Sequence, residues 1–339
     1  MPRSGTTAGI RHEANARGAL AALLVAFVAL CSVAAPSAAA NVRIGFLSPS
    51  TAEGSAFILE SLRQGLRDHG FADGAGVTIE ARFADDRFDR LSALARELVE
   101  LPVDVLVTYV TQASIAAKQA TDRIPIVMLG VSDPLASGLV ASLSRPGGNI
   151  TGTSGAFTGM TGKGIQLLRE AVPGLRRAAV VWNPGNRVFQ AQMRAEAETS
   201  ARQLGIALHF FEATEPVSLE AAFAAIASQR LPVIVLPDPV FAGSWGLIAA
   251  LAANARLPSV TVSEAYAEAG GLMAYGPSLS DLSRRTAGYV AKILKGTKPA
   301  TLAIERPTKY ELVINLKTAK QIGMTMPQSL RLRADRLIE

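Results

Sequence analysis

One stretch of the sequence, Val103 to Pro134, constrains the fold more than any other. It holds two short apolar runs, VDVLVTYV and IPIVMLG, on either side of a segment of helical composition from about Gln112 to Thr121. Strands that are buried on both faces read as continuous Val, Ile and Leu, because helices cover both sides of a parallel sheet. The stretch therefore predicts a β-α-β unit. Both runs end in small polar or turn-forming residues, and open α/β sheets bind ligands beyond the carboxyl ends of their strands.

The first forty residues have the anatomy of a secretory signal peptide. Three arginines within the first seventeen residues precede an apolar core from Ala21 to Ala35, and three alanines stand before Asn41. The alternative is an uncleaved membrane anchor, but the apolar core is only about 15–18 residues long and ends at Pro36, short for a stable span. We therefore expect residues 1–40 to be a cleaved signal peptide and the mature protein to be periplasmic.

Removal of this segment changes what the composition implies. The mature chain keeps 31 basic and 27 acidic residues, a net charge of +4, and it has no basic run that would favour nucleic-acid binding. The only cysteine, Cys31, leaves with the signal, and Leu30 before it disfavours a lipid anchor. His69 and His209 lie inside predicted elements, and nothing clusters with them at the spacing of metal ligands. We expect no metal and no cofactor.

From Val42 onward, predicted strands and helices alternate. The expected strands, beyond the two in the opening stretch, cover residues 42–48, 77–83, 178–183, 206–212, 232–238, 258–264, 272–276 and 311–315. The expected helices cover about 55–69, 86–101, 136–143, 160–172, 188–204, 219–229, 241–255 and 279–294, with two short helical pieces near the end. This alternation predicts right-handed β-α-β units and parallel sheets.

An internal similarity divides the chain into two related parts. LVELPVDVLVT followed by TDRIPIVMLGVSDP resembles IASQRLPVIVLPD followed by NARLPSVTVSEA in the second half. On this alignment Thr108 corresponds roughly to Pro237 and Asp238, and Gly130 corresponds to Ser263. We therefore predict an α/β protein with two doubly wound parallel-sheet lobes, joined by a hinge and facing one another through the carboxyl ends of their strands.

Several motifs together resemble one known family. They are GFLSPS, AAKQATDRIPIVMLGVSDPLASGLVASLSRPGGNITGTS, AVVWNPGN, VLPDP, EAGGLMAYGPSLSDLSRRTAGYVAKILKG and PTKYELVINLKTAK, and they span 41–339 in order. The resemblance is to periplasmic substrate-binding proteins of ABC importers, in the branch named after tryptophan and tyrosine transport. It implies a type I periplasmic-binding-protein fold, a small solute, no enzymatic activity, and an inner-membrane permease and ATPase as partners.

The resemblance and the element pattern suggest where the lobes begin and end. We expect lobe 1 to comprise residues 41–152 and about 277–308, and lobe 2 to comprise 153–276 and about 309–339. We expect a monomer. Residues at strand ends are the candidates for binding the ligand: Ser48, Ser50, Thr108, Tyr109, Gln112, Ser132 and Asp133 in the first lobe, and Asn183, Asn186, Asp238, Glu264 and Tyr266 in the second.

The chemistry expected of these residues is that of an amino acid or a related small carboxylate. Helix N-termini after the loops suit a carboxylate, and an ammonium group would pair with Asp238 or Glu264. Apolar walls are expected from Phe57, Tyr109, Phe241 and Tyr266.

Each candidate also has a structural alternative. The serines are suited to cap helices, Asp133 before Pro134 fits an Asx turn, and Asn183 and Asn186 flank a Pro-Gly turn.

Two other functions are alternatives for a chain with this predicted fold. A ligand-sensing subunit of a membrane receptor would have the same fold and the same cleft, and the residues do not distinguish it from a transport receptor. An exported α/β enzyme is disfavoured, because the chain has no G-x-S-x-G motif, no cysteine after Cys31, and no histidine in a strand-end loop.

Overall fold

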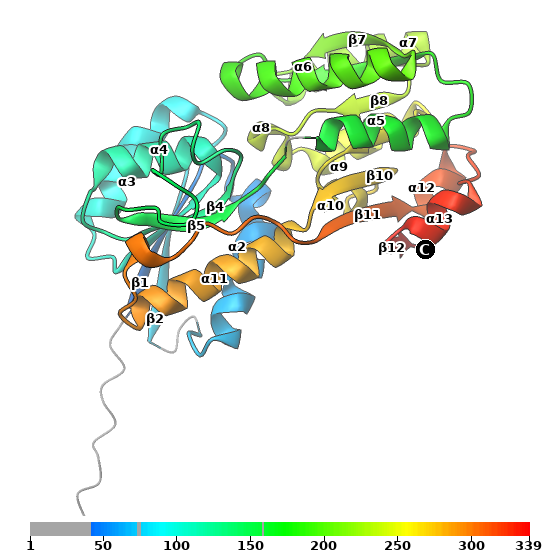
Figure 1. The fold of residues 1–339 in the computed structure, drawn as a ribbon. Coiled ribbons are helices and arrows are strands. Elements are labelled where there is room, and N and C mark those ends of the chain that lie inside the picture. Colours follow the sequence, from blue (N-terminus) through cyan, green and yellow to red (C-terminus); the bar gives the residue numbers. More distant parts are fainter. Residues whose placement is uncertain (1–41, 73–75, 158) are drawn as a thin grey trace, which may run out of the picture. The chain divides into compact units, whose positions relative to one another are not determined.

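The computed structural model describes residues 42–72, 76–157 and 159–339. The predicted signal peptide, residues 1–40, lies outside the described residues. Within the described part, no helix is long and apolar enough to cross a membrane. The described chain forms two α/β lobes, each built around its own sheet (Figure 1).

The first lobe contains a five-stranded parallel sheet in the order β2-β1-β3-β4-β5. Its strands are β1 (Val42–Ser48), β2 (Val77–Phe83), β3 (Val105–Tyr109), β4 (Ile126–Val131) and β5 (Ile150–Ser154). The strand order reverses between β1 and β3, which is the place where open α/β sheets leave a crevice for ligands.

The second lobe contains a seven-stranded sheet in the order β12-β11-β10-β9-β8-β6-β7. Its strands are β6 (Arg177–Trp182), β7 (Ala207–Glu212), β8 (Val233–Val235), β9 (Ser259–Thr261), β10 (Met273–Pro277), β11 (Tyr310–Asn315) and β12 (Arg336–Ile338). Only β10 and β11 pair antiparallel. From β7 to β10 the order repeats that of the first sheet, with β8 and β9 in the places of β3 and β4. The internal sequence similarity is therefore confirmed at the level of topology.

Helices cover both faces of each sheet. The first lobe has α2 (Ala52–Asp68), α3 (Leu91–Glu100), α4 (Val110–Ala120), α11 (Leu279–Leu294) and the 3₁₀ turns η1 (Phe88–Arg90) and η2 (Pro299–Thr301). The second has α5 (Met160–Ala171), α6 (Arg187–Leu204), α7 (Pro216–Gln229), α8 (Pro239–Ala242), α9 (Trp245–Asn254), α10 (Glu264–Glu268), α12 (Leu316–Gln321) and α13 (Gln328–Arg333).

Successive residues of β1 show how one strand serves two cores. Phe46 packs with α2 and α11 on one face of the sheet, and Leu47 packs with α3 and α4 on the other. Side chains alternate between the faces of a strand, so a strand covered on both faces needs apolar residues at every position. This explains why the buried strands were recognisable as continuous apolar runs.

The chain passes between the two sheets three times: after β5, after β10 and before β11. Helix α11 follows β10 of the second sheet, yet its apolar side packs against the first sheet, with Leu282 and Val290 in the same core as Ile44. Ser278 caps this helix, since its Oγ accepts a hydrogen bond from the Asp281 N–H at 3.4 Å.

Three expectations about elements were wrong. Residues 136–143 form turns rather than a helix, because the Asp133 carboxylate holds an Asx turn with the N–H groups of Leu135 and Ala136, both at 3.0 Å. The single helix expected over 241–255 is two helices, α8 and α9, separated at Gly243 and Ser244. The strand expected over 258–264 ends at Thr261, and Glu264 instead begins the short helix α10.

Candidate ligand-binding site

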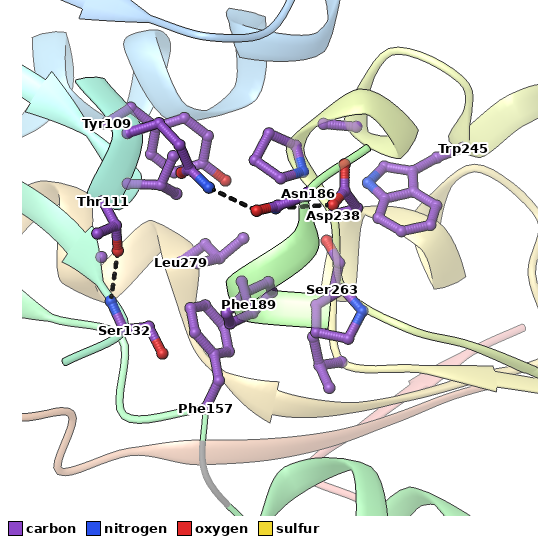
Figure 2. A pocket seen from close by; sticks show the side chains of 17 residues that line it. Tyr109, Thr111, Ser132, Phe157, Asn186, Phe189, Asp238, Trp245, Ser263 and Leu279 are labelled. Carbon is purple, nitrogen blue, oxygen red and sulfur yellow. Dashed lines mark hydrogen bonds between the residues drawn. The ribbon is translucent and has the colours of Figure 1, made fainter. Parts of the chain in front are cut away.

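A pocket lies at the carboxyl ends of the strands of both lobes (Figure 2). It encloses about 630 Å³ of empty space, a volume that includes open solvent. Its walls are mainly apolar, with four aromatic side chains: Tyr109, Phe157, Phe189 and Trp245. The residues that line it include one carboxylate, Asp238, and no lysine or arginine.

The sharp passage from β3 into α4 forms one wall of this pocket. Tyr109 is the last residue of the strand and Val110 is the first of the helix, where it adopts a φ of +58°. This left-handed conformation is costly for a β-branched residue and is found mostly at functional sites. It brings Thr111 and Gln112, in the first turn of α4, to the edge of the pocket.

The N-terminus of α4 has no side-chain cap, because the N-cap residue, Tyr109, makes no capping hydrogen bond. The first N–H groups of a helix lack partners within the helix and carry partial positive charge. The wall formed by Val110, Thr111 and Gln112 is therefore suited to an anionic group such as a carboxylate.

A chain of hydrogen bonds connects the two lobes beside the pocket. Gln112 Nε2 donates to Asn186 Oδ1 at 2.9 Å, and Asn186 Nδ2 donates to Asp238 Oδ2 at 2.9 Å (Figure 2). Asn186 is the N-cap residue of α6, but its side chain makes no capping hydrogen bond there. Its amide is used instead to join α4 of the first lobe to the loop after β8 in the second.

Asp238 is almost completely buried, and amide groups surround its carboxylate. Oδ1 accepts from Asn183 Nδ2 at 3.0 Å and from the Val240 N–H at 3.1 Å, while Oδ2 accepts from Asn186 and Gln190, each at 2.9 Å. Four hydrogen bonds occupy the lone-pair sites of a carboxylate. Burial raises the pKa of Asp238, and these hydrogen bonds act against that shift.

Four other polar groups at the pocket have no hydrogen-bond partner within the described chain. They are the side-chain hydroxyls of Tyr109, Ser132 and Ser263 and the indole N–H of Trp245. Burial raises the pKa of Tyr109 to about 12, so its phenol stays protonated at neutral pH and can donate a hydrogen bond. These groups are therefore three hydroxyls, each able to donate or to accept a hydrogen bond, and one N–H donor.

A second carboxylate, Asp86, lies close to Asp238 and belongs to the first lobe. Its pKa is raised to about 6, chiefly by burial, with the charges of Asp238 and Asp85 adding to the shift and Ser50 opposing it. Asp85 and Asp86 both have positive φ, 52° and 62°. Asp86 follows the carboxyl end of β2, but it does not line the pocket.

Of the twelve residues expected to bind ligand, the structure places five in the lining: Tyr109, Gln112, Ser132, Asn186 and Asp238. The other seven are buried or lie in turns and do not line it. Among these, Ser48 bonds to Ser55 at 2.8 Å and Thr108 to Ser114 at 2.8 Å, so both hydroxyls connect a strand to the next helix.

The remaining residues outside the lining also have internal contacts. Asp133 holds the Asx turn described above, and Asn183 donates to Asp238. Glu264 accepts from the Ser280 N–H at 3.1 Å, and the Tyr266 hydroxyl lies 2.6 Å from Ser259 Oγ. Ser50 is fully buried, and its backbone N–H donates to Ser48 Oγ at 3.2 Å.

Of the four residues expected to form apolar walls, Tyr109 lines this pocket and the other three do not. Phe241 and Tyr266 are completely buried in the core of the second lobe, and Phe57 does not line this pocket. Trp245 and Phe189 line the pocket instead. Phe189 lies in the first turn of α6, and Trp245 is the first residue of α9, which begins only because the helix expected over 241–255 is interrupted at Gly243 and Ser244. The internal similarity was informative, since Gly130 and Ser263, which it aligns, both line the pocket.

Comparisons with known proteins agree with this geometry. The family model described as "ABC transporter substrate binding protein" matches residues 47–338. A curated "Tyrosine-binding protein" of Clostridioides difficile (strain R20291) is 24% identical over 260 residues, covering 76% of this chain and 74% of that protein.

Two solved structures have a similar fold. A conserved domain protein of Vibrio cholerae is 28% identical, with a TM-score of 0.78, and the match covers 88% of this chain and 99% of that one. An ABC domain from Streptococcus pneumoniae, solved in complex with L-Trp, is 23% identical, with a TM-score of 0.77 and coverage of 88% and 100%. The two lobes therefore have the type I periplasmic-binding-protein fold that the motifs implied. Proteins of this group bind solutes and are not enzymes.

Proposed function

Since the chain belongs to the family of ABC transporter substrate-binding proteins, we propose that it is an extracytoplasmic receptor for an amino acid or a related small carboxylate. On this proposal it binds the solute between its two lobes and delivers it to a permease and ATPase in the inner membrane. The observation that carries the proposal is the pocket itself, in which an uncapped helix N-terminus faces aromatic walls from both lobes.

The proposed orientation of the ligand follows from where the unpartnered groups lie. The ligand carboxylate accepts hydrogen bonds from the first N–H groups of α4 and from the Ser132 hydroxyl. An aromatic side chain of the ligand packs among Phe189, Trp245 and Phe157. Two relatives support an aromatic amino acid, since one is named for tyrosine and another was solved with L-Trp.

Asp238 is the proposed partner of the ligand ammonium. Because its oxygens already accept four hydrogen bonds, it acts through its charge and by holding Asn186, rather than through a bidentate ion pair. A buried charge next to an apolar cavity is only weakly screened by solvent, so its field reaches a ligand that it does not contact.

The mechanism that we propose is closure of the lobes. A ligand that contacts α4 in the first lobe and α9 in the second shifts the equilibrium between open and closed forms toward the closed form. A dissociation constant in the micromolar range, about −8 kcal/mol, is expected for such a receptor. The lobe boundaries that we propose are the three crossings, near residues 152–153, 276–277 and 308–309, and the mature receptor is a periplasmic monomer.

Thermal unfolding in the presence of a ligand panel tests this proposal. The panel contains L-tyrosine, L-tryptophan and L-phenylalanine with their amine and carboxylic-acid analogues. The amines lack the carboxylate, and the carboxylic acids lack the ammonium group. We expect stabilisation by at least one amino acid and less by the compounds that lack the carboxylate or the ammonium group. No stabilisation by any amino acid or small carboxylate would refute the proposed ligand class.

A further inference from the structure

The two lobes touch through a pair of glycines beside the pocket. Gly54 lies in the first turn of α2 in the first lobe, and Gly243 is the C-cap residue of α8 in the second. A Cβ atom added to Gly54 would lie closest to Ser50 Oγ of its own lobe, and it would lie 2.7 Å from the Gly243 nitrogen and 3.0 Å from the Gly243 Cα. These separations are too short for any side chain, so the two backbones are in direct contact.

Backbone conformation does not explain why these positions are glycine. Gly243 has a φ of −73° and a ψ of −11°, which any residue adopts. Gly54 lies in a helix with negative φ, where glycine costs about 0.5–1 kcal/mol relative to alanine. At Gly243 the nearest atoms belong to the other lobe, so close approach of the two lobes is a physical reason for the missing side chain; at Gly54, Ser50 Oγ of the same lobe adds to this constraint.

The surroundings of Gly243 come from the opposite lobe alone. The three atoms nearest to a Cβ at this position are Thr51 Oγ1 at 3.0 Å and the Cα and N of Gly54, both at 3.8 Å. All three belong to the N-terminus of α2. A side chain at 243 would therefore be accommodated by the second lobe by itself, and would clash only when the lobes are together.

The contact is directly connected to the pocket. Gly243 follows Ala242 and precedes Trp245 by two residues, and both of these line the pocket. Thr51, on the other side of the contact, caps α2 by accepting the Gly54 N–H at 3.0 Å. Movement of the lobes at this point would therefore displace the Trp245 wall relative to α2.

We propose that Gly54 and Gly243 form the contact on which the lobes close, and that the missing side chain at 243 is a positioning feature that sets ligand affinity. This inference rests on the proposed function, because closure has a role only if a ligand is captured between the lobes. Gly243 does not touch the ligand. It determines how closely the lobes approach around it.

Substitution at 243 tests this role with a matched control. Gly243→Ala and Gly243→Val are expected to raise the dissociation constant for L-tyrosine or L-tryptophan, by about fivefold and by more than tenfold respectively, since about 1.4 kcal/mol corresponds to tenfold. The rise is expected in the dissociation rate, with an unchanged melting temperature of the ligand-free protein. Gly246→Ala is the control, because no atom lies within 4 Å of a Cβ there. Wild-type affinity in Gly243→Val would overturn the proposal.

A disulfide tests the contact without any ligand. A sulfur in place of Thr51 Oγ1 would lie 3.0 Å from a Cβ at 243, which is the spacing of about 3 Å between a sulfur and the far Cβ that disulfide geometry requires. We expect Thr51→Cys/Gly243→Cys to form this disulfide under mild oxidation of the ligand-free protein, and Thr51→Cys/Gly246→Cys not to form one. If Thr51→Cys/Gly243→Cys does not form the disulfide, the proposed contact between the lobes is refuted, even if the wild-type protein binds amino acids. Disulfide formation in a protein that binds none of them would refute only the ligand class.

Discussion

Gln112 and Asn186, which belong to different lobes, are joined by a hydrogen bond of 2.9 Å from Nε2 to Oδ1. Asn186 is itself held by Asp238, so its amide can present only one orientation to Gln112. Both residues line the pocket. The bond therefore links the two lobes beside the pocket, and on the proposed mechanism it forms as the lobes close.

We expect Gln112→Ala to weaken ligand binding about two- to tenfold, since a hydrogen bond of this kind contributes about 0.5–1.5 kcal/mol. The melting temperature of the ligand-free protein should not change, because the bond spans the lobes rather than either core. Titration calorimetry with L-tyrosine or L-tryptophan measures the effect. Gln166→Ala is a suitable control, as this glutamine is exposed on α5. Equal affinities in the two variants would contradict the role of Gln112 in the closed form.

Asp238→Ala is expected to weaken binding of an amino acid and also to lower stability. Loss of the carboxylate removes the proposed partner of the ammonium group and leaves the amides of Asn183 and Asn186 without an acceptor, at about 1–3 kcal/mol for each buried group left unpaired. Gln190 keeps the Pro237 carbonyl as an acceptor, at 2.8 Å. Affinity should fall much less for a ligand analogue without the ammonium group, which separates the electrostatic role from the structural one.

Asp133→Ala provides the comparison for that experiment. Asp133 precedes Pro134 much as Asp238 precedes Pro239, but its carboxylate is used in a turn and does not line the pocket. Its loss should lower the melting temperature slightly and leave ligand affinity unchanged. If Asp133→Ala lowered affinity as much as Asp238→Ala, the assignment of the ligand to this pocket would be wrong.

Asp86 is expected to make stability depend on pH. Its pKa rises from 3.8 in the unfolded chain to about 6 in the folded protein, so the folded state binds the proton more tightly. The free energy of unfolding should therefore decrease as pH rises from about 4 to about 6, and the loss should be complete above that range. Asp86→Asn removes this dependence, and asparagine tolerates the positive φ at this position.

Urea unfolding of the wild type and of Asp86→Asn at pH 4.5 and pH 7.5 provides the measurement. We expect the variant to gain stability relative to the wild type at the higher pH, and to gain little or nothing at the lower one. A stability difference that is the same at both values, or larger at pH 4.5, would show that Asp86 ionises normally in the folded protein.

Trp245 should report binding through its fluorescence. The chain has two tryptophans. Trp245 lines the pocket and Trp182 does not, and the Arg194 guanidinium lies 5.1 Å from the centroid of the Trp182 ring. In a Trp182→Phe variant, we expect a non-fluorescent ligand such as L-phenylalanine to change the emission of the remaining Trp245. Trp245→Phe should abolish the ligand-dependent signal and weaken binding modestly. A ligand signal that persisted in Trp245→Phe would place binding near Trp182 instead.

The fold was predictable from the sequence because its signals are local. Most of the buried strands are apolar runs, and the similarity of the stretches around Gly130 and Ser263 predicted two lobes built alike. The two sheets share a strand order, in agreement with this prediction. Short elements were less predictable. Ile150–Ser154 contains two threonines and a glycine, and only its position beside β4 in the sheet makes it a strand.

The polar part of the site followed from the rule that ligands bind at strand ends, which identified Gln112, Asn186 and Asp238. That rule does not say which side chain faces the cavity and which faces the protein. Glu264 and Tyr266 follow a strand as Asp238 does. However, β9 already ends at Thr261 and α10 begins at Glu264, and in this helix both side chains are buried in the interior. Which residues form the aromatic walls depends on the packing of helices that are distant in sequence.

The most direct test of the account is a crystal structure of the protein, purified without refolding and crystallised with saturating L-tyrosine or L-tryptophan. We predict one amino acid between Tyr109 and Trp245, with its carboxylate about 3 Å from the first N–H groups of α4, within hydrogen-bonding distance, and with contacts to both lobes. A pocket that remains empty, or a ligand that contacts one lobe only, would contradict the central claim.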